Sequence, residues 1–125
     1  MLSIYKTTES GLETLDTIAN GAWVNVVGPT PDEIEKLVNW GMDMDYINYS
    51  LDQDEMPRME RDEDYTFILL RIPMHQPDSD IPYNTVPLGI MILGNKIITV
   101  CRYDSDIFKS LANGKAKQLK SGRRY

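Results

Sequence analysis

Two long apolar runs, 65–73 and 86–101, dominate the hydrophobic pattern of the chain. Within them the apolar residues are consecutive rather than alternating, as in 90–93 and 97–100. Consecutive apolar residues are typical of strands that other layers cover on both faces. A buried helix gives similar runs, but prolines and glycines interrupt these ones at strand length. The pattern therefore predicts strands in the middle of a sheet.

Shorter strands and turns surround these two runs. Gly94-Asn95 predicts a tight turn, which divides the second run into the hairpin strands 86–93 and 96–102. Between the two runs, 75–84 holds two prolines and shows no periodicity. This segment predicts a mobile connection between antiparallel strands, long for a hairpin. Four further segments have the alternation or the β-branched content of strands: 2–7, 12–15, 22–27 and 56–60.

The clearest helix signal is a capping box that begins at Thr30. The Thr30 hydroxyl is placed to accept an N–H of the first turn, and Glu33 stands at the position that bonds back. Pro31 between them loses no hydrogen bond at the first helical position. The box predicts a short amphipathic helix over 31–40.

Two more helices follow from the same kind of evidence. Asp43 is placed to cap a helix over 44–51, whose apolar residues recur at helical spacing. Asp104 or Ser105 is placed to cap a helix that ends at Gly114. With the strands, these helices predict an α/β fold: a mixed, largely antiparallel central sheet with helices packed on both faces, as in a partial α/β/α sandwich.

Length and composition describe an ordinary single domain. The chain has 125 residues, of which 42% are hydrophobic and 26% charged. Its formal net charge of −6 argues against broad binding to nucleic-acid phosphates, which attract basic surfaces. The single cysteine, Cys101, lies in an apolar strand and predicts a buried, inert thiol in a reducing compartment. With no apolar segment of membrane-spanning length and no signal-peptide pattern, we expect a soluble intracellular domain.

The inventory of reactive residues predicts no enzyme. The one histidine, His75, falls in the proline-rich connection, far from any expected nucleophile. Gly89 and Gly94 have the glycine spacing of a phosphate loop, but no Lys-Ser/Thr follows and the residues between them read as strand interior. One cysteine and one histidine are too few to build a zinc site.

The acidic stretch 52–64 is the one candidate for ion chemistry, with seven acidic residues. Magnesium and calcium prefer carboxylate oxygens. Asp52 and Asp54 begin like a calcium loop, but Met56 and Pro57 stand where an oxygen ligand and a glycine belong. Two interpretations follow: a solvated acidic turn, or a loose contact for a divalent ion, formed between subunits.

Four segments together resemble one known family. In chain order they are Trp23-Val-Asn-Val-Val27, Pro29-Thr-Pro-Asp-Glu33, Pro57-Arg-Met-Glu60 followed by Asp64-Tyr-Thr-Phe-Ile-Leu-Leu70, and Pro87-Leu-Gly-Ile-Met-Ile-Leu-Gly-Asn-Lys-Ile-Ile-Thr-Val100. Over about residues 20–110 their order and spacing resemble the amino-terminal cytoplasmic domain of CorA-type magnesium and divalent-cation transporters.

The resemblance implies more than the residues show. Family members are homopentameric channels for Mg²⁺ or related ions, in which a cytoplasmic α/β/α domain precedes a long helix and two membrane helices. The pore carries a Gly-Met-Asn signature, which is not in this sequence. We therefore expect a fragment of a membrane protein, with domain 1–114 on the cytoplasmic side and a basic tail, 115–125, starting a missing helical segment. By itself it is expected to be a monomer or weak dimer.

One departure from the family bears on its regulatory ion. Many members carry a Glu-Asp pair that helps bind Mg²⁺ between subunits, and the matching positions here are Asn48 and Tyr49. Neither supplies a carboxylate. Asp45 and Asp52 lie about one helical turn to either side and are the candidate substitutes. Together with two neighbours they make the set of candidate metal ligands: Asp45, Asp52, Asp54 and Glu55.

Two functions remain open at this point. The resemblance implies a cytoplasmic regulatory domain that senses Mg²⁺ or gates a CorA-like transporter, without a pore of its own. The alternative is a free-standing α/β module that binds a small ligand or oligomerises. Two hydrophobic segments and a Gly-Met-Asn downstream in the gene would favour the first.

Overall fold

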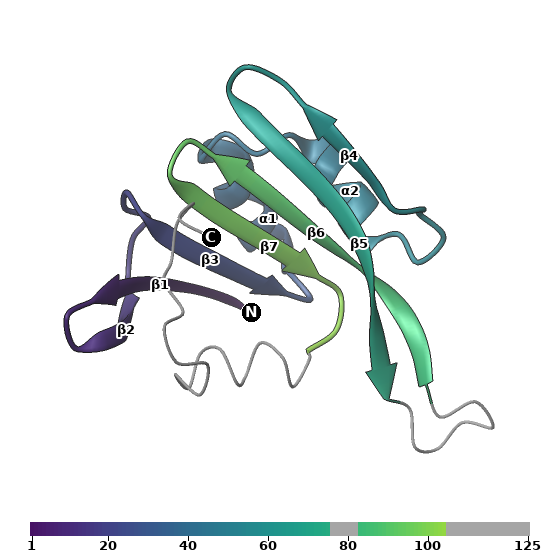
Figure 1. Ribbon diagram of the computed structural model, residues 1–125, viewed down its shortest axis with the longest axis horizontal. Coiled ribbons are helices and arrows are strands. Elements are labelled where there is room, and N and C mark those ends of the chain that lie inside the picture. The colour runs from purple at the N-terminus through teal and green to yellow at the C-terminus, as the bar shows by residue number, and fades with distance from the viewer. Residues whose placement is uncertain (76–82, 105–125) are drawn as a thin grey trace.

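The apolar runs form the middle of one sheet of seven strands (Figure 1). The computed structural model describes residues 1–75 and 83–104, and the order of the strands in the sheet is β2-β1-β3-β7-β6-β5-β4. The described elements are β1 (Leu2–Thr8), β2 (Gly11–Leu15), β3 (Ala22–Val27), α1 (Pro31–Asn39), α2 (Met44–Leu51), β4 (Arg58–Arg61), β5 (Tyr65–His75), β6 (Tyr83–Leu93) and β7 (Lys96–Cys101).

The sheet is mixed and largely antiparallel, as predicted. Among the described strands only β3 and β7 run parallel, with Trp23 opposite Ile97 and Val27 opposite Cys101. The chain leaves the sheet after β3, forms α1 and α2, and returns through β4, β5 and β6 to place β7 beside β3. A parallel neighbour requires such a crossover connection, whereas antiparallel neighbours need only short turns.

Both described helices pack on the same face of the sheet (Figure 1). The core on this face joins Leu37 of α1 and Ile47 of α2 to strand residues such as Val24, Phe67 and Ile98. The opposite face carries a second, smaller apolar cluster: Trp23, Val86, Leu88 and Cys101. The prediction of helices on both faces included one over 104–114, of which 105–114 lie outside the described residues.

The two apolar faces explain the consecutive apolar residues, with one correction. Phe67 and Leu69 of β5 point to the helices and are fully buried, whereas Leu70 on the other face is 43% exposed. The expectation of cover on both faces is therefore wrong at Leu70. A consecutive apolar run shows that a residue is suited to burial, but not that another layer reaches it.

The central hairpin is also longer than predicted. Residues 75–84 were expected to form a connection, but β5 continues to His75 and β6 begins at Tyr83. β5 pairs with β4 only as far as Leu69, and β6 pairs with β7 only from Leu88 onward. Among the described strands, the remaining parts, β5 after Leu69 and β6 before Leu88, pair only with each other. They form a two-stranded arm that projects from the sheet (Figure 1).

The caps predicted for α1 and α2 are present, and the third predicted helix lies outside the described residues. Thr30 Oγ1 accepts a hydrogen bond from the Glu33 N–H at 3.2 Å, and the Thr30 N–H donates to Glu33 Oε1 at 3.0 Å. The amino-terminal ammonium of Met1 lies 3.1 Å from the same carboxylate. Burial raises the pKa of Glu33, but the hydrogen bonds from Thr30 and the nearby ammonium outweigh it, so the net pKa is lowered. At α2, Asp43 Oδ1 accepts from the Asp45 N–H at 2.8 Å.

Helix α2 lies unusually close to β6 at Gly89. A Cβ placed on Gly89 would lie 1.7 Å from Ser50 Oγ and 2.6 Å from Ser50 Cβ. Ser50 is fully buried, and its hydroxyl donates to the carbonyl oxygen of Tyr46 at 2.7 Å. The helix approaches the strand only because position 89 has no side chain.

We predict that Gly89→Ala lowers the free energy of unfolding by on the order of 1–3 kcal/mol, because the new methyl group overpacks against Ser50. Chemical denaturation of the purified domain measures the change. The double variant Ser50→Gly/Gly89→Ala removes both clashing Ser50 atoms. It should lose clearly less stability than the sum of the two single variants, and strict additivity would contradict the proposed contact.

Candidate functional site

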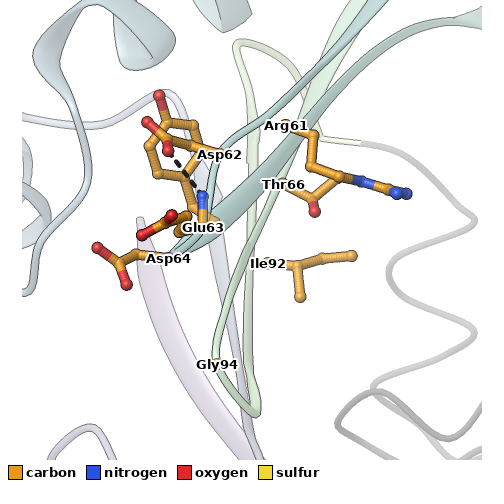
Figure 2. A pocket seen from close by; sticks show the side chains of 8 residues that line it. Arg61, Asp62, Glu63, Asp64, Thr66, Ile92 and Gly94 are labelled. Atoms are coloured by element: carbon orange, nitrogen blue, oxygen red, sulfur yellow. Dashed lines mark hydrogen bonds between the residues drawn. The ribbon is translucent and has the colours of Figure 1, made fainter.

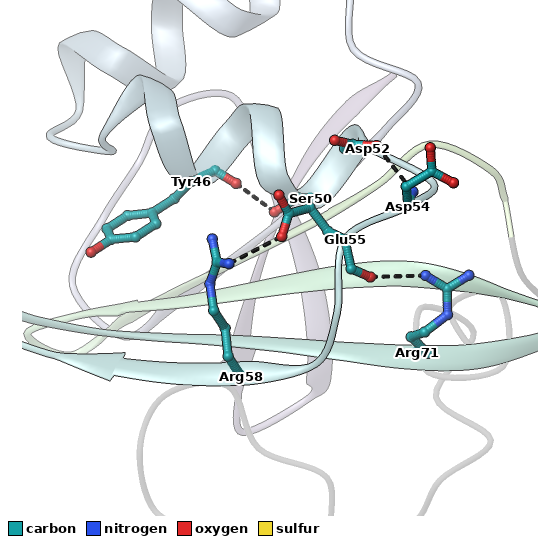
Figure 3. A network of polar contacts seen from close by, with 7 residues as sticks. All are labelled: Tyr46, Ser50, Asp52, Asp54, Glu55, Arg58 and Arg71. Carbon is teal, nitrogen blue, oxygen red and sulfur yellow. Dashed lines mark hydrogen bonds and ion pairs between the residues drawn. The ribbon is translucent and has the colours of Figure 1, made fainter.

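The candidate metal ligands lie around helix α2 and the loop that follows it (Figure 3). Asp52 is the carboxyl-terminal cap of α2, and its Oδ1 accepts from the Asp54 N–H at 3.0 Å. The Glu55 N–H donates to the Asp52 carbonyl oxygen at 3.1 Å. These bonds fold 52–55 into a tight turn, from which the exposed Asp52 and Asp54 face solvent.

Arg71 of β5 fastens this acidic turn to the sheet. One of its terminal nitrogens donates to the carbonyl oxygens of Gln53 and Glu55, at 2.9 and 3.0 Å. The rest of the guanidinium donates to the side chain and the carbonyl oxygen of Thr85 on β6, at 2.9 and 2.8 Å. Gln53 adds a bond of 2.8 Å from its amide to the same carbonyl oxygen. The turn is therefore held by its backbone, which leaves its carboxylates unused by this clamp.

A second arginine neutralises one of the candidate ligands. Arg58 of β4 pairs with Glu55 Oε2 at 3.0 Å, and its guanidinium lies 4.1 Å from the centre of the Tyr49 ring (Figure 3). Its Nε is buried and has no hydrogen-bond partner. Of the candidate carboxylates, Glu55 is thus the one already compensated by an internal cation.

Asp45 does not join this group. It occupies the first turn of α2, whereas the other three candidates follow the last turn. With a rise of about 1.5 Å per residue, the length of the helix separates them by roughly 10 Å. Within residues 1–75 and 83–104, no group of three or more His, Cys, Asp and Glu side chains is arranged to hold a metal ion.

The acidic stretch 52–64 is split into two separate sites. Strand β4 stands between the turn at 52–55 and a second turn at 62–64, so their carboxylates lie at opposite ends of that strand. At the second turn the Asp62 N–H donates to the Tyr65 carbonyl oxygen at 2.9 Å, and Asp62 Oδ1 accepts from the Glu63 N–H at 2.7 Å. The sequence analysis treated 52–64 as one candidate site, whereas in the structure β4 divides it into the turns at 52–55 and 62–64.

A shallow pocket of about 330 Å³ accompanies the second turn (Figure 2). The acidic side chains of the turn lie on one side of it, and Arg61 points to the other side (Figure 2). Thr66, Ile92 and Gly94 complete the lining together with Tyr65. The three carboxylates are exposed, so water screens their mutual repulsion.

A tyrosine pair connects α2 to the sheet near this pocket. The Tyr46 and Tyr65 hydroxyl oxygens lie 2.9 Å apart, and the Tyr46 ring stacks on Phe67 with 4.3 Å between ring centres. The hydrogen bond to Tyr65, burial and the nearby Glu60 carboxylate all raise the pKa of Tyr46. Tyr46 therefore stays protonated near neutral pH and serves as a structural contact.

Sequence reasoning missed the residues that hold the site together. Arg71 interrupts an otherwise apolar strand, and this was the available signal for it. A charged residue in such a run indicates a hydrogen-bond or ion-pair partner in the fold, because burying a charge without one is costly. Arg58 and Tyr49 offered no comparable signal, since their contact depends on how α2 is placed over β4.

Comparisons with known proteins place this domain. The family model described as "CorA-like Mg2+ transporter protein" matches residues 19–123. The cobalt/magnesium transport protein CorA of Methanocaldococcus jannaschii is 32% identical over 79 residues, which cover 62% of this chain and 24% of that protein. The chain thus spans about a quarter of the length of this curated relative.

Solved structures share the fold. The soluble domain of CorA from Methanocaldococcus jannaschii superposes with a TM-score of 0.76 at 24% identity, over 95% of this chain and 47% of that one. The ZntB cytoplasmic domain from Vibrio parahaemolyticus gives a TM-score of 0.71 at 19% identity, over 95% and 51% of the two chains. In the part of our chain that the structure describes, neither helix has the length and apolar content to cross a membrane.

We predict that Arg71→Gln loosens the acidic turn without unfolding the domain. The Asp54 and Glu55 amides, which donate within the turn, should exchange with solvent roughly tenfold faster or more, because several charge-assisted bonds are lost. Hydrogen exchange followed by NMR measures this. Arg61→Gln removes the same charge from an exposed position and is the matched control. Equal exchange of both amides in the two variants would contradict the role of Arg71.

Proposed function

The chain belongs to the family of CorA-like Mg²⁺ transporter proteins, and we propose that it is the cytoplasmic regulatory domain of a membrane transporter for Mg²⁺ or a related divalent cation. The family is one of transporters rather than a class of enzymes. In our proposal the domain senses or gates, carries no catalytic site, and works as one subunit of a homopentamer whose pore lies outside residues 1–125.

The observation that carries this proposal is the rigid acidic turn at the end of α2. Asp52 and Asp54 are exposed, and Arg71 bonds the carbonyl oxygens of Gln53 and Glu55 in this turn to the arm of β5 and β6. When two such domains meet, carboxylates held in place repel one another. A divalent ion between them screens this repulsion and favours a closed assembly, and loss of the ion favours a looser one.

Exposed apolar side chains near the edge strand β4 support a place for this edge of the sheet at a subunit boundary. Met56, Met59 and Leu70 are 70%, 59% and 43% exposed. Met59 on the edge strand β4 and Leu70 on the adjacent β5 belong to the same face of the sheet, because the residue opposite Met59 is Ile68. Exposed apolar side chains beside a charged rim are typical of surfaces that another protein covers.

The ion-binding residues in this proposal differ from those of many relatives. At the positions of the family's Glu-Asp pair, Asn48 is exposed and Tyr49 carries the Arg58 guanidinium on its ring. We propose Asp45, Asp52 and Asp54 as the carboxylates that contact Mg²⁺, each supplied to a site completed by a neighbouring subunit. Glu55, paired with Arg58, contributes only if that ion pair opens.

We predict that the isolated domain binds Mg²⁺ weakly, in the millimolar range, and that Asp45→Ala and Asp52→Ala each weaken binding several-fold, because each removes a carboxylate ligand. Isothermal titration calorimetry measures the affinity. Asp16→Ala removes an exposed carboxylate far from α2 in sequence and should change nothing. No binding at millimolar Mg²⁺, or binding that both test variants leave unaffected, would sink the proposed ion site.

Light scattering tests the assembly independently of the ion. We predict that the 125-residue chain is a monomer or weak dimer in solution, because the described domain contributes one exposed edge rather than an extended interface. Introducing a negative charge by Met59→Glu should abolish any dimer that forms through that edge, whereas Val38→Glu on α1 should not. A stable pentamer of this chain alone would contradict the prediction.

A further inference from the structure

A second pocket lies where the two parallel strands end, next to the last residue of α2. Its volume is about 350 Å³, within the size range of small-ligand sites. β3 and β7 run side by side in the same direction, and the chain leaves both at the same edge of the sheet (Figure 1). In α/β proteins this edge, beyond the carboxyl ends of parallel strands, is the place where ligands bind. The lining residues are Gly28, Pro29, Leu51, Arg102 and Tyr103.

Backbone, rather than side chains, forms the wall between the two strand ends. The Gly28 N–H donates to the Cys101 carbonyl oxygen at 2.9 Å, which continues the parallel ladder by one residue. Gly28 has φ of +50°, and a Cβ placed there would lie 3.3 Å from the Arg102 carbonyl oxygen. A side chain at this position would be strained and would crowd the strand end, so glycine keeps the opening clear.

The one charged side chain among the described lining residues of this pocket is that of Arg102. None of these described residues carries a carboxylate, although the chain as a whole has a net charge of −6. Arg102 is exposed, and no carboxylate of the described residues forms an ion pair with it. Its guanidinium lies 5.8 Å from the centre of the Tyr103 ring, which is itself 43% exposed. An arginine without a counterion beside an exposed aromatic ring provides a ligand with a planar hydrogen-bonding cation and a flat apolar surface together.

The amino-terminal end of α1 is close in sequence but does not supply the attraction. Its first turn is closed by the capping box of Thr30 and Glu33, and Glu33 brings its own negative charge. Among the described residues that line the pocket, Arg102 is the one cation, so its guanidinium is the group placed to attract an anion.

We propose that this pocket binds a small anionic ligand that carries a phosphate and a planar ring, the chemistry of a nucleoside monophosphate. Arg102 pairs with the phosphate oxygens, since guanidinium matches phosphate geometry in two parallel hydrogen bonds. The planar ring stacks on Tyr103, and Leu51 with Pro29 supplies apolar contact below it. Such a ligand would give the domain an input that is separate from divalent cations.

The test is an NMR titration of the ¹⁵N-labelled 125-residue chain with adenosine 5′-monophosphate in metal-free buffer. We expect saturable shifts of the Gly28, Arg102 and Tyr103 amides, with an affinity in the millimolar range or tighter. Adenosine and inorganic phosphate, titrated separately, should each bind more weakly than the whole nucleotide, because each makes only one of the two contacts.

Variants separate this site from general attraction of anions. Arg102→Gln should weaken binding roughly tenfold or more, as expected for the loss of a charge-assisted pair, and Tyr103→Leu should weaken it for the nucleotide but not for phosphate. Arg61→Gln removes the same charge beside the turn at 62–64, outside this pocket, and should bind like the parent chain. The spectra themselves report whether each variant is folded. No saturable shifts up to about 10 mM, or equal binding by Arg102→Gln and Arg61→Gln, would overturn the proposal.

Discussion

The close approach of helix α2 to strand β6 at Gly89 is the contact on which the rest of the domain depends. With Ser50 Oγ only 1.7 Å from where a Cβ would stand, the helix cannot sit at this depth over any residue except glycine. At this depth the Tyr46 ring reaches Phe67 and its hydroxyl reaches Tyr65. The helix end is fixed by the same contact, so the turn that follows Leu51 meets the sheet within reach of Arg71.

Charge is distributed around this packing in a way that a sum over the sequence does not reveal. Within the acidic stretch 52–64, Arg58 compensates the charge of Glu55. Arg71, which lies outside the stretch on β5, bonds only to backbone and to Thr85. The clamp thus adds a positive charge near the turn without consuming the carboxylates of Asp52 and Asp54. An arginine that paired with these side chains would have fixed the turn equally well and removed its charge from the surface.

Local signals predicted much of the fold, and non-local contacts account for what was missed. The capping box at Thr30 and the cap at Asp43 are complete within four residues, so the sequence alone shows where along the chain α1 and α2 begin. The contacts of Arg71 with Thr85 and of Arg58 with Tyr49 depend on strand register and helix position instead. The pocket of Gly28 and Arg102 requires β3 and β7 to be parallel neighbours, which no periodicity encodes. The candidate ligands were found by residue type, and the separation of Asp45 from the other three by the length of α2 depends on how the helix is placed.

Rigidity of the acidic turn is what makes it suited to act on a whole domain. Carboxylates on a loose loop relieve repulsion by rotating into water, and a nearby ion then changes little beyond the loop itself. Here the carbonyl oxygens of Gln53 and Glu55 and the side chain of Gln53 are bonded to Arg71 and Thr85 on the two-stranded arm of β5 and β6, so the turn is tied to that arm. Repulsion between two such turns is relieved by displacing the domains that carry them, or by a cation placed between them. In the proposed assembly, the clamp at Arg71 therefore transmits repulsion between two acidic turns to the domains that carry them.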